Sequence, residues 1–131
     1  MTKPIALIVE DDNMLGTFFT ATLADAGFQT ELAQNGAEAL AYLEKNAPTL
    51  ILLDLQLPDT TGEGILSYIE TQAHLAQTRI FATSIEGTRA SYLQEKVDLV
   101  LTKPVSYHQL INLSKRMIPA EHPAQAESNG E

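Results

Sequence analysis

Cysteine is absent from the 131 residues of this sequence. Its absence excludes disulfide bonds, thiolate zinc sites and cysteine nucleophiles, and it is compatible with a cytoplasmic location, which we expect. The sequence also lacks a long hydrophobic run, and the apolar residues 5–9 are followed at once by three acids. We therefore expect neither a membrane-spanning segment nor a secretory signal.

Basic residues are scarce: 8 Lys and Arg accompany 17 Asp and Glu, and the formal net charge is −9. A surface of that sign repels nucleic-acid phosphates, so we expect no nucleic-acid binding through this domain. Residues 120–131 combine acids with Pro, Ser and Gly and have no aliphatic pattern, which predicts a disordered acidic tail. The preceding residues 1–119 are long enough for one domain with a core of its own.

What the sequence does contain is a series of short apolar runs. Four of them, at 5–9, 49–55, 79–84 and 99–102, are continuous rather than alternating, which is typical of strands buried on both faces. A further short strand, the second in chain order, is predicted at 29–33. The segments between them carry helical spacing, and right-handed crossovers then predict a doubly wound, five-stranded parallel α/β sheet with helices on both faces.

Capping residues indicate where several helices begin. Asp12 or Asn13 can cap the first helix, and Asn35 can cap the second. Ser106 can begin the last helix. The polar segment 89–95 predicts a shorter helix before the fifth strand.

Polar groups follow the apolar runs at the end where the predicted strands finish. In chain order these groups are Glu10, Asp11, Asp54, Ser84 and Lys103. In an open parallel sheet, the carboxyl ends of the strands form the edge where ligands and chemistry collect. The sequence therefore predicts one site built from these side chains.

The three acids of this site indicate a metal ion. Carboxylates gathered in one pocket repel each other and favour a cation between them. An all-oxygen donor set without His or Cys suits a hard ion such as Mg²⁺, with Asp11 and Asp54 as direct ligands and Glu10 acting through water. A carboxylate can also act as a nucleophile and form an aspartyl phosphate. The Lys103 ammonium and the Ser84 hydroxyl are suited to the charge and oxygens of a phosphoryl group.

These motifs together resemble the receiver domain of two-component response regulators, over residues 4–119. The resemblance rests on five features in the correct order, each near a strand end. They are the acidic pair Glu10 and Asp11, Asp54 within the run 52–58, Gly62, Ser84, and Lys103 with Pro104. The resemblance implies a flavodoxin-like (βα)5 fold.

The resemblance also implies a role for each residue. Asp54 would accept a phosphoryl group from a sensor histidine kinase or a histidine phosphotransfer protein. Asp11 would bind Mg²⁺, assisted by Glu10 and the backbone carbonyl of Gln56. Ser84 would move toward the phosphoryl group and Lys103 would pair with it. Phosphorylation would then switch binding to a downstream protein target, in a stand-alone signalling domain rather than a turnover enzyme.

Some positions leave alternatives open. Thr83 is a second candidate for the hydroxyl, although Ser84 ends the run, and Asp59 is a poorer phosphoacceptor than Asp54 because it lies in the following loop. Val100 lies where receivers usually carry an aromatic switch residue, and the stretch between Ser84 and Lys103 is short. The resemblance therefore implies intact phosphorylation chemistry with an output mechanism that is not standard.

Two other functions that use a similar sheet lack residues that they require. A phosphatase of the haloacid dehalogenase type needs a second Asp two residues after its nucleophile, where this chain has Gln56. A flavodoxin-like cofactor binder needs a loop that cradles phosphate, and the acidic residues 10–12 would repel it. The main alternative is a phosphorylation-independent pseudo-receiver for docking or dimerisation.

Overall fold

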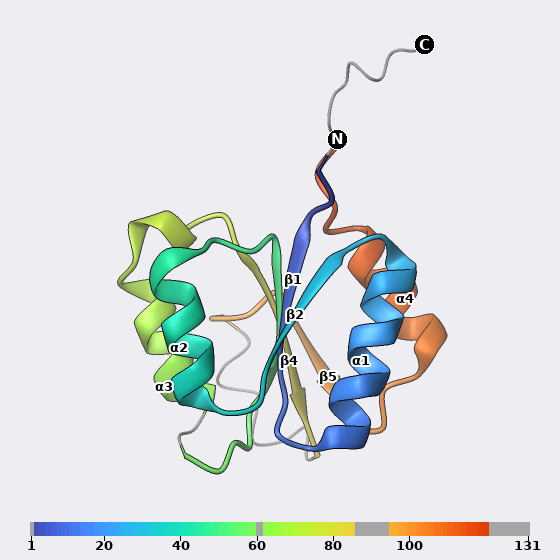
Figure 1. Cartoon of the computed structure of the whole chain (residues 1–131), viewed down its shortest axis with the longest axis horizontal. Coiled ribbons are helices and arrows are strands. Elements are labelled where there is room, and N and C mark those ends of the chain that lie inside the picture. The colour runs from blue at the N-terminus through green and yellow to red at the C-terminus, as the bar shows by residue number, and fades with distance from the viewer. Residues whose placement is uncertain (1, 60–61, 86–94, 121–131) are drawn as a thin grey trace.

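The computed structural model describes residues 2–59, 62–85 and 95–120. They form an α/β/α sandwich in which helices cover both faces of a single sheet (Figure 1). The elements are β1 (Ile5–Val9), α1 (Asn13–Ala26), β2 (Gln29–Ala33), α2 (Gly36–Lys45), β3 (Leu50–Asp54), α3 (Gly62–Glu70), the 3-10 turn η1 (Ala73–Leu75), β4 (Arg79–Ser84), β5 (Leu99–Thr102) and α4 (Tyr107–Lys115).

The sheet has five parallel strands in the order β2-β1-β3-β4-β5. The order reverses between β1 and β3, which are neighbours although β2 lies between them in the chain. Their register pairs Val9 with Leu53, so the two carboxyl ends finish side by side. Crevices for ligands form at such a reversal point. The predicted doubly wound, flavodoxin-like parallel sheet is confirmed.

Two apolar cores, one on each face of the sheet, hold the layers together. Alternate strand residues such as Leu7, Ile51 and Leu53 pack with α2 and α3, and their neighbours Ile8 and Leu52 pack with α1 and α4. Both faces of the central strands are therefore apolar, which explains why these strands appear in the sequence as continuous apolar runs.

The helices begin where the capping residues predicted. Asp12, rather than Asn13, caps α1, because its Oδ1 accepts the Leu15 N–H at 2.9 Å. Asn35 Oδ1 accepts the Glu38 N–H at 2.9 Å at the start of α2. Ser106 caps α4 in the same way.

Some expectations fall on other parts of the chain. The predicted helix at 89–95 and the predicted tail at 120–131 lie almost wholly outside the described residues. Within the described ranges, none of the helices is long and apolar enough to cross a membrane.

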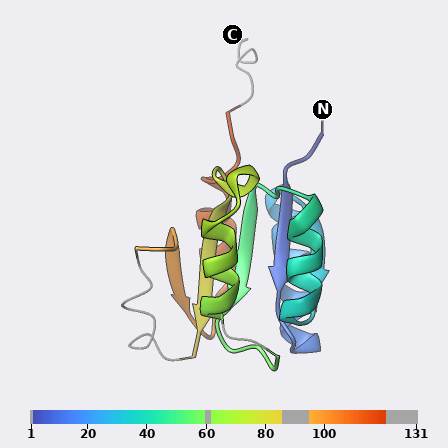
Figure 2. The ribbon, with the colours of Figure 1, turned by 90° about the vertical axis from the view of Figure 1, so that its left-hand side faces the viewer.

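The two ends of the described chain lie at the same edge of the sheet. Residues 2–4 enter β1 from that edge, and the chain leaves α4 toward it (Figures 1 and 2). Near the exit, Ile118 comes close to Gly27, the glycine with a φ of 113° that ends α1. The carboxyl ends of the strands, with the predicted site, form the opposite edge.

Candidate functional site

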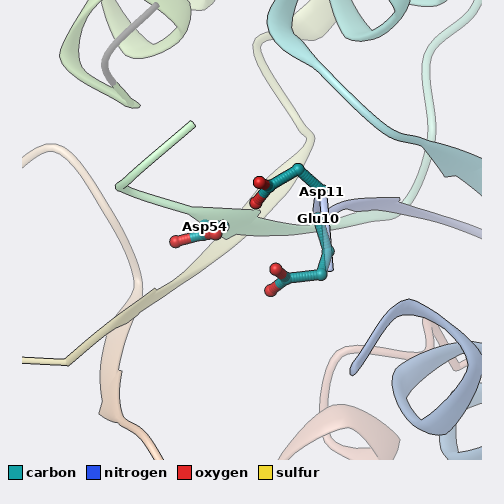
Figure 3. A group of neighbouring side chains, drawn as sticks. All are labelled: Glu10, Asp11 and Asp54. Atoms are coloured by element: carbon teal, nitrogen blue, oxygen red, sulfur yellow. The ribbon is translucent and has the colours of Figure 1, made fainter. Parts of the chain in front are cut away.

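Three carboxyl groups converge at the carboxyl edge of the sheet. Glu10 and Asp11 follow β1, and Asp54 ends β3, the neighbouring strand. Figure 3 shows the three side chains turned toward one space beside the end of β3. One carboxylate oxygen from each lies within 4.8 Å of the others. The structure therefore brings together all three acids that the sequence suggested as a metal site.

The three acids differ in their contact with solvent. Glu10 and Asp54 are each only 2% exposed, whereas Asp11 is exposed. A charge is held in the interior only when an opposite charge or several hydrogen bonds compensate for its lost hydration. The site is therefore a half-enclosed acidic pocket with an open side at Asp11.

Lys103 provides a positive charge beside the two buried acids. It follows β5, and its ammonium Nζ lies 3.2 Å from Glu10 Oε1 and 3.4 Å from Asp54 Oδ2. One ammonium is thus shared by two buried carboxylates, and Asp11 adds a third acid beside them. The pocket keeps an excess of negative charge, which a divalent cation would offset.

The environment of Glu10 shows the same imbalance. Burial raises the pKa of its carboxyl group and the nearby charge of Asp54 adds to the rise, while the backbone N–H of Asp12 and the Lys103 ammonium oppose it. Glu10 Oε2 accepts the Asp12 N–H at 3.2 Å. The other oxygen, Oε1, is buried and contacts the ammonium, but it accepts no well-formed hydrogen bond from any residue that the structure describes. An under-coordinated carboxylate oxygen in an all-oxygen acidic pocket fits Mg²⁺, which binds carboxylates together with water.

The loop after β3 wraps around Asp54. The Gln56 N–H donates to Asp54 Oδ1 at 2.9 Å, and the Leu55 N–H donates to the Thr83 carbonyl on β4 at 3.0 Å. These bonds fix the backbone immediately after the acid. Gln56, whose carbonyl was predicted to complete the metal shell, therefore lies directly beside the Asp54 carboxyl group.

Both candidate hydroxyls lie at the end of β4 and both are buried, at 1% exposure each. Thr83 is the register partner of Asp54, so the two side chains leave the sheet on the same face. The Thr83 hydroxyl has no hydrogen-bond partner among the described residues. Ser84 lies one residue further along, and its carbonyl accepts the Lys103 N–H at 2.8 Å. The role of Ser84 stays a prediction.

Asp59 makes a contact near the site that no pattern in the sequence predicts. Asp59, in the loop after β3, binds the backbone at the start of α2: Oδ1 accepts the Gly36 N–H at 2.8 Å and Oδ2 accepts the Ala37 N–H at 3.0 Å. The partners are more than twenty positions apart in the chain. Only the folded structure shows that this loop residue also caps the start of α2.

The fold and the site together define a class of protein: a doubly wound α/β domain with acids, hydroxyls and a lysine at the carboxyl edge of its sheet. The family model for the response regulator receiver domain matches residues 6–115. The chain belongs to this family. Receiver domains are the signalling modules of two-component systems, and a phosphoaspartate and Mg²⁺ are features of the family.

Individual relatives support the same assignment. The polar-differentiation response regulator DivK of Brucella ovis is 28% identical over 118 residues, which cover 88% of this chain and 95% of the relative. Among solved structures, the chemotaxis response regulator CheY4 of Vibrio cholerae is similar with a TM-score of 0.81 and 26% identity, over 89% of this chain and 100% of that one. A CheY-like receiver domain from Methylobacillus flagellatus has a TM-score of 0.80 and 25% identity, over 87% and 98%.

Proposed function

We propose that this domain accepts a phosphoryl group on Asp54 from a phosphohistidine donor, either a sensor histidine kinase or a histidine phosphotransfer protein. Phosphorylation then alters binding to a downstream protein target. The observation that carries the proposal is the convergence of three carboxylates within 4.8 Å, with the Lys103 ammonium 3.4 Å from Asp54 Oδ2. Its own phosphorylation and dephosphorylation are the only reactions that the domain assists.

In this proposal Mg²⁺ is held by Asp11, Asp54 and the backbone carbonyl of Gln56, with Glu10 assisting. The bound ion supplies positive charge for the phosphoryl oxygens. Asp11, which is exposed, leaves the pocket open on the side from which a donor can approach. The bond from the Gln56 N–H to Asp54 Oδ1 keeps the loop and the acid in one arrangement.

The transfer exchanges one bond to phosphorus for another. A carboxylate oxygen of Asp54 attacks the phosphorus, the phosphorus–nitrogen bond of the phosphohistidine breaks, and the imidazole leaves with the electron pair and takes up a proton. The product is an acyl phosphate on Asp54. Lys103 neutralises charge on the phosphoryl oxygens, and the Ser84 hydroxyl donates a hydrogen bond to one of them. Such a reaction depends mainly on positioning and on charge stabilisation.

The direct test is incubation with Mg²⁺ and acetyl phosphate, followed by measurement of the intact mass. We expect a phosphoryl adduct on the wild type and none on Asp54→Asn. If the wild type gives no adduct, the same measurement with a phosphohistidine donor follows. Failure with both donors in a protein that binds Mg²⁺ would contradict the proposal and favour a phosphorylation-independent docking or dimerisation module.

A further inference from the structure

The start of α2 takes hydrogen-bond acceptors from two different parts of the chain. The first N–H groups of a helix have no partner within the helix. Asn35, the adjacent capping residue, accepts the Glu38 N–H. The two preceding N–H groups, of Gly36 and Ala37, are bound instead by both oxygens of Asp59. A residue of the β3–α3 loop thus accepts two of these three N–H groups.

The same loop is anchored at both of its ends. At its start the Gln56 N–H binds the carboxylate of Asp54. At its end the Gly62 N–H donates to the Leu55 carbonyl at 3.2 Å, and Gly62 packs so closely that an added Cβ would lie 2.9 Å from the Leu55 Cα. Asp59 adds a third anchor between these two, and this one joins the loop to another element.

The Asp59 anchor is a strong one for an exposed side chain. Its carboxylate makes two charge-assisted bonds at a helix N-terminus, where the helix dipole also favours a negative charge. The bond from the Gly36 N–H has the largest effect on the pKa of Asp59 and lowers it; desolvation opposes this effect, and the bond from the Ala37 N–H adds to the lowering. The carboxylate is therefore ionised at neutral pH, the state in which it accepts both bonds.

We infer that Asp59 is a positioning residue for the phosphoryl site: by binding α2, it fixes the backbone three residues beyond Gln56 and so the course of the loop that leaves Asp54. This inference rests on the proposed function. It assigns to α2, which contributes no side chain to the acidic pocket, a part in holding the metal-binding loop. Loss of the contact should loosen the loop without removing any metal ligand.

The test compares Asp59→Ala with Asn35→Ala. Both variants weaken the cap of the same helix, but Asn35 belongs to the chain next to α2 and not to the loop. Two quantities are measured for each variant: the hydrogen exchange of the Gln56 amide without any cation, and the Mg²⁺ concentration at half-maximal phosphorylation by acetyl phosphate. Asp59→Asn, which keeps one acceptor oxygen, serves as the conservative variant.

We expect Asp59→Ala to speed exchange of the Gln56 amide and to raise the half-maximal Mg²⁺ concentration roughly ten-fold, because losing a group that orients a metal ligand commonly weakens metal binding by that factor or more. Asn35→Ala should lower the melting temperature and leave both quantities near the wild-type values. Asp59→Asn should fall between Asp59→Ala and the wild type.

If Asp59→Ala and Asn35→Ala changed the Gln56 exchange rate and the half-maximal Mg²⁺ concentration equally, the inference would be overturned. The cause would then be the lower stability of α2 and not the loss of the contact with the loop. Unchanged exchange at Gln56 in Asp59→Ala would overturn it as well. A wild type that forms no adduct would contradict the proposed function, while the exchange measurement, which needs no phosphoryl donor, would still decide whether Asp59 holds the loop.

Discussion

Among the described carboxyl groups, Glu10 is one whose surroundings disfavour ionisation. It is buried, it lies beside Asp54, and its pKa is raised. At neutral pH without a divalent cation, we expect Glu10→Gln to raise the melting temperature by a few degrees, as roughly 1 kcal/mol does in a domain of this size. Lys103 keeps Asp54 as its partner in the variant. Thermal unfolding in chelator checks this, with the exposed Glu44→Gln as control; a lower melting temperature would contradict it.

The neighbouring hydroxyls at the end of β4 allow a paired test. Thr83→Val replaces a buried hydroxyl that lacks a described partner by a methyl group of similar shape, so we expect about 1 kcal/mol of added stability and unchanged phosphorylation. Ser84→Ala should instead slow formation of the acyl phosphate roughly ten-fold or more, because it removes a donor to the phosphoryl oxygens. Urea unfolding and adduct formation over time measure the two effects. The reverse pattern would assign the hydroxyl role to Thr83.

Asp59 predicts a particular dependence of stability on pH. Its pKa in the folded protein lies below the ordinary value of 3.8, so its contribution is fully present above that value and is lost as the pH falls through the folded pKa. We expect Asp59→Asn to be less stable than the wild type at neutral pH, with the difference shrinking in acid. Urea unfolding at a series of pH values measures the difference, and a constant difference would argue against an ionised cap.

At the scale of elements, β5 carries Val100, at the position where the resemblance to receiver domains predicts an aromatic switch residue. Val100 is only half-buried, pairs with Ala82 in the sheet, and has no ring that could move between a buried and an exposed position. We therefore expect phosphorylation to cause only small backbone changes in β5 and α4. Amide chemical shifts of the phosphorylated and unphosphorylated protein test this expectation. Large shifts across both elements would show that another residue transmits the signal.

Elements whose bounds depend on residues close in sequence could be predicted, whereas features that depend on contacts between distant residues could not. β4 begins and ends where its apolar run does, and β2 has the predicted bounds. Asn35 and Ser106 cap their helices through bonds to residues three positions away. The turn η1 was not predicted, because a single 3-10 turn of three residues has no periodicity to detect. The bond from Asp59 to α2 was missed because it depends on how two loops meet in space.

The candidate site shows the same division. Polar residues at strand ends predicted that Glu10, Asp11, Asp54 and Lys103 would meet, because parallel strands share one carboxyl edge, and the structure brings them together. That one Lys103 ammonium contacts both Glu10 and Asp54 could not be predicted, because a strand pattern does not give the positions of side-chain atoms. Which residue accepts a phosphoryl group and which bind a metal stay predictions.

At the scale of the whole molecule, a metal ion that binds only the folded pocket should stabilise the domain. We expect Mg²⁺ at about 100 times its dissociation constant to add about 2.7 kcal/mol to the free energy of unfolding. Asp11→Asn should remove most of this gain while leaving the metal-free stability close to wild type, since the Asp11 side chain is exposed. Thermal unfolding with and without Mg²⁺ measures both. An equal gain in the variant would exclude Asp11 as a ligand.

The position of the two described chain ends has a practical consequence for experiments on this domain. Both lie at the edge of the sheet opposite the carboxylate pocket (Figure 2). A biosensor chip, bead or fluorescent reporter joined next to residue 2 or residue 120 would therefore lie away from the pocket. The protein can be immobilised near either described end with the pocket still accessible from solution. Binding of a partner that is the same with both attachments is then not an artefact of the surface.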